Sequence, residues 1–105
     1  MSDPFAVQSR DDPHRDQPIE TAGAPPPAAD AAVILLHGRG STAKQVLRLA
    51  DEFHHHGVMY LAPQAAPRTW YPRSGYAPYE DNEPWFSSAL DRVSAALGVA
   101  ADADV

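Results

Sequence analysis

Cysteine is absent from the 105 residues, which excludes a disulfide framework, a thiolate nucleophile and a sulfur-ligated metal site. Positive charge is scarce: eight Lys and Arg face fourteen Asp and Glu, and the formal net charge is −6. This balance argues against a nucleic-acid-binding protein, which needs a cationic face. No apolar run approaches the roughly 18 residues of a membrane span, and no secretory signal is visible. We therefore expect a soluble, cytoplasmic chain of at most one domain.

Large apolar side chains are rare in residues 1–30, which instead carry six of the eleven prolines together with charged and small residues. Such a segment cannot bury enough apolar surface to offset the conformational entropy that ordering costs. The sequence therefore predicts a disordered leader over residues 1–30. Residues 99–105 are predicted to form a small acidic tail.

The leader ends in a sharp change of composition. Residues 31–36 are apolar without alternation, which is typical of a strand that is covered on both faces in a parallel sheet. Helical periodicity follows, with Ser41 or Thr42 as its candidate cap and Gly57 as its end. Residues 58–62 form a second apolar run, so the pattern predicts a strand–helix–strand unit.

A long connection over residues 63–84 is rich in proline and aromatic residues, and rigid aromatics in so long a loop favour a functional role. A second helix is expected from Pro84 to a stop at Gly98. Two strands and two helices cannot cover a strand as apolar as the first on both faces. Residues 31–98 are therefore predicted to be the N-terminal part of a larger α/β domain with an incomplete sheet.

The turn after the first strand, His37-Gly38-Arg39-Gly40, is the most informative motif. Its glycines let the backbone approach a ligand, and the helix start beyond it offers unpaired N–H groups that favour negative charge. A nucleotide P-loop is excluded by its spacing. Residues 38–43 do match G-x-G-x-x-G/A, although the second strand ends without the carboxylate expected about 20 positions on. A phosphate- or dinucleotide-binding module without turnover is therefore the alternative interpretation.

An oxyanion hole is the other chemistry that such a turn can serve. In α/β-hydrolases a His-Gly loop after an early strand presents a backbone N–H to the oxyanion that develops during ester cleavage. The position of His37 and Gly38 directly after an apolar strand fits this arrangement.

The turn belongs to the first of four sequence blocks that follow one another along the chain: residues 35–40, 60–65, 69–72 and 82–90. Four blocks in order are more specific than any one of them. From Val33 to about Leu97 the chain resembles the phospholipase/carboxylesterase family of serine hydrolases, relatives of the acyl-protein thioesterases. The resemblance implies an α/β-hydrolase fold and hydrolysis of a small carboxylic ester or thioester without a cofactor. It says nothing of the oligomeric state.

The resemblance also implies roles for individual residues. The backbone N–H of Arg39 would be one oxyanion donor, the loop would be shaped by His37, Gly38 and Gly40, and the substrate would contact Trp70 and Tyr71. Family members often carry an apolar residue in place of Arg39, which changes the rim of the hole but not its main-chain donor. The family's G-x-S-x-G elbow and later Asp and His are not among these residues. We therefore expect an N-terminal fragment that lacks the Ser-Asp-His triad and is inactive alone.

Two other clusters have simpler interpretations. Three consecutive histidines, residues 54–56, point about 100° apart on a helix and do not converge on one metal ion, so no metal site is expected. The carboxylates of Glu80, Asp81 and Glu83 precede a helix start, where negative charge is favourable.

Overall fold

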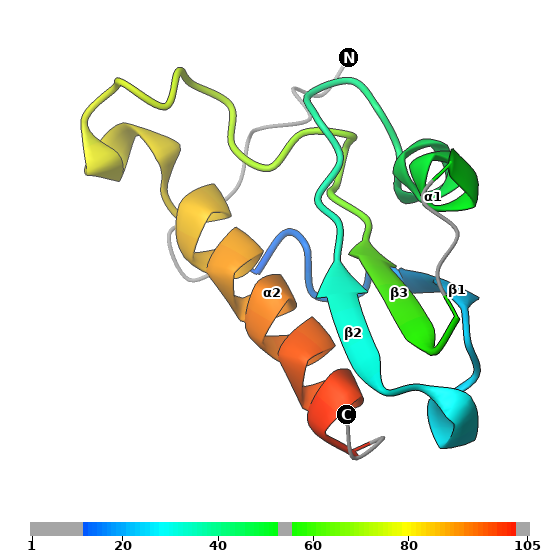
Figure 1. The fold of residues 1–105 in the computed structure, drawn as a ribbon. Coiled ribbons are helices and arrows are strands. Elements are labelled where there is room, and N and C mark those ends of the chain that lie inside the picture. The colour runs from blue at the N-terminus through cyan, green and yellow to red at the C-terminus, as the bar shows by residue number, and fades with distance from the viewer. Residues whose placement is uncertain (1–11, 53–55, 103–105) are drawn as a thin grey trace.

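Figure 1 shows the computed structural model, which describes residues 12–52 and 56–102. The main elements are three strands and two helices: β1 (Ile19–Gly23), β2 (Ala31–Ile34), α1 (Ala43–Glu52), β3 (Val58–Pro63) and α2 (Trp85–Asp102). Two short 3-10 turns add η1 (Pro26–Ala28) and η2 (Tyr79–Asn82).

The strands form one mixed sheet in the order β1-β3-β2. β2 and β3 are parallel, with Ala32 opposite Met59 and Ile34 opposite Leu61, and α1 connects them. This confirms the strand–helix–strand unit predicted from the apolar pattern. β1 runs antiparallel along the other side of β3.

β3 is the buried centre of the molecule. α1 packs against β3 and β1, α2 packs against β3 and β2, and the two helices lie on opposite sides of the sheet (Figure 1). Side chains alternate between the two faces of a strand, and with both faces covered every residue from Met59 to Pro63 is buried. On the α2 side Met59 and Leu61 form the core with Ala100.

The expected burial of residues 31–36 is wrong for this chain. Exposed and half-buried residues alternate along β2, and Val33 and Leu36 are 40% and 50% exposed. The strand has β3 on one edge only within the described part of the chain. α2 covers one of its faces, and the side chain of Val33 points to the other.

The leader predicted over residues 1–30 is corrected for its second half, while residues 1–11 lie outside the described residues. β1 pairs with β3 along its whole length, and the Gln64 N–H donates to the Pro18 carbonyl at 2.9 Å. The guanidinium of Arg92 on α2 donates to the Gln17 carbonyl at 2.8 Å. Main-chain pairing with distant elements thus orders a segment that is poor in apolar side chains.

The helix ends also differ from their predicted places. α2 runs through Gly98 to Asp102, so residues 99–102 are helical and only 103–105 of the predicted tail lie outside the described residues. Burial of Ala96 and Ala100 against the sheet outweighs the low helix propensity of one glycine. α1 ends at Glu52, and residues 53–55, with two of the three histidines, lie outside the described residues.

No helix of the described residues is long and apolar enough to cross a bilayer.

Candidate active site

The loop after β2 is closed by main-chain hydrogen bonds. The Ser41 N–H donates to the Gly38 carbonyl at 3.0 Å, and the Gly40 N–H donates to the Arg68 carbonyl at 2.7 Å. Gly40 has φ +80°, a left-handed conformation that favours glycine. The loop is therefore joined to the segment after β3.

His37 fixes this junction from inside. It is 3% exposed, its Nδ1 donates to the Gly38 carbonyl at 2.9 Å, and its Nε2 accepts from the Ala65 N–H at 3.0 Å. The indole N–H of Trp70 donates to the His37 carbonyl at 3.0 Å, and the two rings stack with centroids 5.2 Å apart. Because both ring nitrogens are engaged, His37 holds the loop and has no nitrogen left for proton transfer to a ligand.

A surface cleft of about 200 Å³ opens beside this junction and is lined by His37, Gly38, Arg39, Thr69, Trp70 and Tyr71. Five of the six residues singled out from the sequence therefore meet in one place, and the sixth, Gly40, lies in the loop that forms one wall. Within the described part of the chain, the backbone N–H groups of Gly38 and Arg39 donate no hydrogen bond. Both residues line the cleft.

At the start of α1, in contrast, two backbone N–H groups already have acceptors within the protein. Thr42 Oγ1 accepts from the Gln45 N–H at 3.1 Å, which confirms Thr42 as the cap, and Gln64 Oε1 accepts from the Ala43 N–H at 2.8 Å. A phosphate bound there would have to displace these protein acceptors. The dinucleotide interpretation of residues 38–43 is not favoured.

The carboxylate cluster before α2 is a helix start, as its sequence position suggested. The Glu83 carboxylate accepts hydrogen bonds from the backbone N–H of Ser87 at 3.1 Å and from its hydroxyl at 2.5 Å. Glu80 and Asp81 are exposed on η2. Among residues 12–52 and 56–102 no three His, Asp or Glu side chains are grouped to hold a metal ion.

A comparison with known proteins supports the resemblance found in the sequence. No family model and no curated protein matches the chain. A crystal structure of a phospholipase/carboxylesterase from Dyadobacter fermentans DSM 18053 is similar, with a TM-score of 0.82 and 34% sequence identity. The match covers 86% of this chain and 43% of that one, so this chain spans less than half the length of that protein. This structural similarity confirms the predicted fold class, an α/β fold that resembles part of an α/β-hydrolase.

The sequence analysis missed a residue behind the cleft, His14. This side chain is fully buried, and its ring lies between Trp70 and Trp85 with centroid distances of 5.1 and 5.3 Å. Nδ1 accepts from the Ala66 N–H at 3.0 Å, so Nε2 carries the proton and donates to the Trp70 carbonyl at 2.8 Å. His14 thus braces the backbone of the same Trp70 whose indole holds His37.

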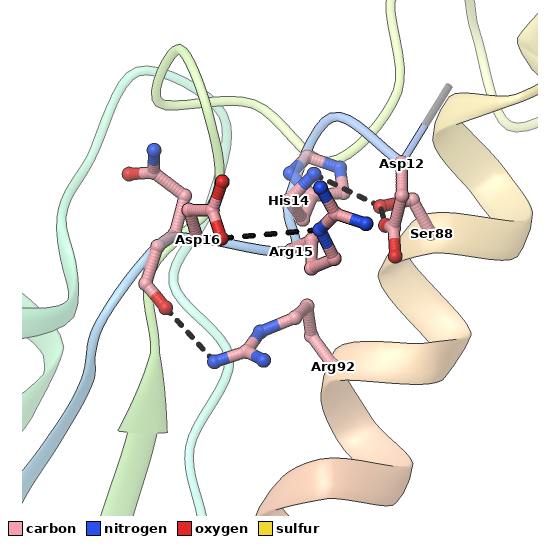
Figure 2. Close-up of polar contacts among 7 residues, drawn as sticks. Asp12, His14, Arg15, Asp16, Ser88 and Arg92 are labelled. Carbon is pink, nitrogen blue, oxygen red and sulfur yellow. Dashed lines mark hydrogen bonds and ion pairs between the residues drawn. The ribbon is translucent and has the colours of Figure 1, made fainter.

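Figure 2 shows that Asp12, His14 and Ser88 lie together, which are the residue types of a serine-hydrolase triad. Their hydrogen bonds are wrong for that role. The Ser88 hydroxyl donates to Asp12 and accepts from the backbone N–H of His14 at 2.9 Å, while the imidazole bonds to other partners. A triad needs the imidazole on the nucleophile's hydroxyl. The cluster fastens residues 12–17 to α2 and is structural.

Burial lowers the pKa of His14 below its ordinary value of 6.5; Arg92 and His37 act in the same direction, and the Trp70 hydrogen bond and the Asp12 charge oppose it. Protonation of Nδ1 would turn this acceptor into a donor that faces the Ala66 N–H, so the hydrogen bond between them would be lost. The unfolded chain therefore binds this proton more readily than the folded one. The stability that His14 contributes is complete above pH 6.5 and is lost as the pH falls toward its lowered pKa.

We expect the free energy of unfolding in urea to be smaller at pH 5.5 than at pH 7.5. NMR titration of the His14 ring protons isolates this group from the other histidines and is expected to give a midpoint below 6.5. A midpoint at or above that value would show that the buried ring accepts its second proton without cost, against the hydrogen-bond assignment.

Proposed function

We propose that this chain supplies the oxyanion loop and substrate cleft of a carboxylic-ester or thioester hydrolase that works through a serine nucleophile. The observation that carries the proposal is that Arg39 lines a cleft and that its backbone N–H donates no hydrogen bond within the described chain. The crystal structure to which the chain is similar is a phospholipase/carboxylesterase. The substrate would be a small ester or thioester, and no cofactor is needed.

In this proposal the carbonyl oxygen of the ester lies against the loop. As the nucleophile attacks, negative charge builds on that oxygen, and a preorganised N–H stabilises the charge without reorganising. His37 and Trp70 keep the loop in place through the bonds described above. The wall formed by Trp70 and Tyr71 excludes water from one side of the bound ester.

The nucleophile, the general base and its orienting acid would come from polypeptide other than these residues. The described serines near the cleft do not fit the role: Ser41 donates to Gln45 Oε1, and Ser74 accepts from the Tyr76 N–H on an exposed loop. Acyl transfer needs a hydroxyl held by a base that is itself oriented.

The test joins residues 1–105 to a segment that supplies a strand, a G-x-S-x-G elbow and the later Asp and His. Hydrolysis of 4-nitrophenyl acetate is expected to appear in the joined protein and to vanish when the elbow serine becomes alanine. Arg39→Pro deletes the donor N–H, whereas Arg39→Ala loses the same side chain and keeps that N–H. The kcat of the proline variant should fall about 10²–10³-fold below that of the alanine variant. Equal kcat values would contradict the role of this amide.

A further inference from the structure

The side chain of Arg39, a residue that lines the cleft, is held in place by three contacts. Its Nη1 donates to the Pro72 carbonyl at 3.2 Å and its Nη2 donates to the Arg73 carbonyl at 3.0 Å. The guanidinium also lies over the Tyr71 ring, 5.8 Å from the centroid. A flexible side chain on an exposed loop thereby has a defined position beside the free N–H of its own backbone.

These contacts fix the guanidinium without cancelling its charge. Carbonyl oxygens and an aromatic ring carry no net charge, and only two of the five N–H groups are used, which leaves three donors. Within residues 12–52 and 56–102, Arg39 makes no ion pair with a carboxylate. By contrast, Arg15 lies 3.9 Å from the carboxylate of its neighbour Asp16.

Positive charge is concentrated near this point in a chain whose net charge is −6. Arg68 and Arg73 belong to the two segments that hydrogen-bond to the loop and to Arg39, and both are exposed. Within the same described ranges, neither forms an ion pair. The positive charge of these three arginines favours an anion beside the cleft, although the net charge of the protein is negative.

We propose that Arg39 is an anion-binding subsite of the cleft and selects esters whose acyl group carries a second, ionised carboxylate. This inference rests on the proposed function and narrows its substrate class to monoesters of short dicarboxylic acids. The ester carbonyl faces the Arg39 N–H and the free carboxylate meets the guanidinium of the same residue. Because one arginine spans both groups, the acyl chain between them must be short.

Carboxylate suits the free donors better than a neutral polar group. A planar guanidinium can donate two parallel hydrogen bonds to a carboxylate, and charge-assisted bonds are about twice as strong as neutral ones. Exposed ion pairs are usually weak because two flexible side chains must be ordered. Here Pro72, Arg73 and Tyr71 have already ordered the arginine, which removes part of that cost.

The experiment measures binding of two ketones that cannot be hydrolysed and differ in one terminal group. 4-Oxopentanoate carries a carboxylate, and 2,5-hexanedione carries a neutral acetyl group on the same short chain. Chemical shifts of the Arg39 amide and the Trp70 indole report each dissociation constant. The carboxylate ligand is expected to bind roughly tenfold more tightly at low salt, and the preference should shrink at 0.5 M NaCl as charge is screened.

Arg39→Gln is expected to reduce the preference to about one, and Arg48→Gln, which removes the same charge from exposed α1, should preserve it. An equal affinity of the unsubstituted chain for the two ligands, or a preference that survives in Arg39→Gln, would overturn the subsite. A fall in affinity for both ligands with an unchanged ratio would do the same and make Arg39 only a loop support. Because no turnover is measured, these outcomes are separate from success or failure of the hydrolysis test.

Discussion

His14→Ala is expected to lower the free energy of unfolding by about 3 kcal/mol, the range seen when a large, well-packed buried side chain is truncated. The substitution opens a void between Trp70 and Trp85 and leaves the Ala66 N–H and the Trp70 carbonyl without their partners. Urea unfolding at pH 7.5, followed by far-UV circular dichroism, measures the loss. Near-UV dichroism of the folded fraction should weaken as well, because two tryptophans lose a rigid neighbour.

Arg15→Ala is the matched control, one residue away on the same segment (Figure 2). The Arg15 side chain is 73% exposed, and among the residues that the structure describes its ion pair is with the neighbouring Asp16, so its removal should change stability by less than about 0.5 kcal/mol. If the free energies of unfolding of the two variants agree within experimental error, residues 12–17 do not pack against the rest of the protein as the structure shows.

Gly23→Ala is expected to lower the free energy of unfolding by about 2–3 kcal/mol. Gly23 ends β1 with φ +81°, where an L side chain is strained by about 1–2 kcal/mol. A Cβ there would collide with the Val58 carbonyl oxygen and lie 2.8 Å from Cδ2 of the Tyr60 ring. Backbone and ring must both shift, which adds a cost of the kind seen for overpacked sites. Urea unfolding quantifies the loss.

The same substitution at Gly98 should change the free energy of unfolding in the opposite direction. Gly98 lies inside α2, and a Cβ there meets nothing within 4 Å. Alanine is the better helix former by about 1 kcal/mol, so Gly98→Ala is expected to stabilise the chain. A loss of stability at Gly98, or none at Gly23, would contradict the backbone conformations on which both expectations depend.

The sequence predicted the elements whose residues follow a local pattern. The apolar run before His37 and the helical spacing after Thr42 are read within a dozen residues, and β2, α1 and β3 formed as expected. β1 has no such pattern, because its order comes from pairing with a strand some forty residues later, as in Ile19 opposite Pro63. Composition alone therefore assigned it to a disordered leader.

The residues that form and support the cleft likewise include some that the sequence could predict and some that it could not. Its loop could be predicted because Gly38 and Gly40 mark a tight turn after a strand, and a family resemblance added Trp70. His14 could not, since its ring bonds to residues 52 and 56 positions away, and one histidine among prolines gives no periodic signal. Arg39 itself could be predicted from the motif, whereas the carbonyls that hold its side chain lie 33 and 34 positions further on.

The attachment of residues 12–18 has a practical consequence for anyone who trims this protein for expression. A boundary drawn where the composition changes, after residue 30, would discard an edge strand of the sheet and the imidazole that braces Trp70. Such a shortened protein would expose one side of β3 and loosen a cleft wall that is far away in the sequence. Purification tags and protease sites therefore belong ahead of Asp12, because cleavage beyond it would cut through a support of the binding region.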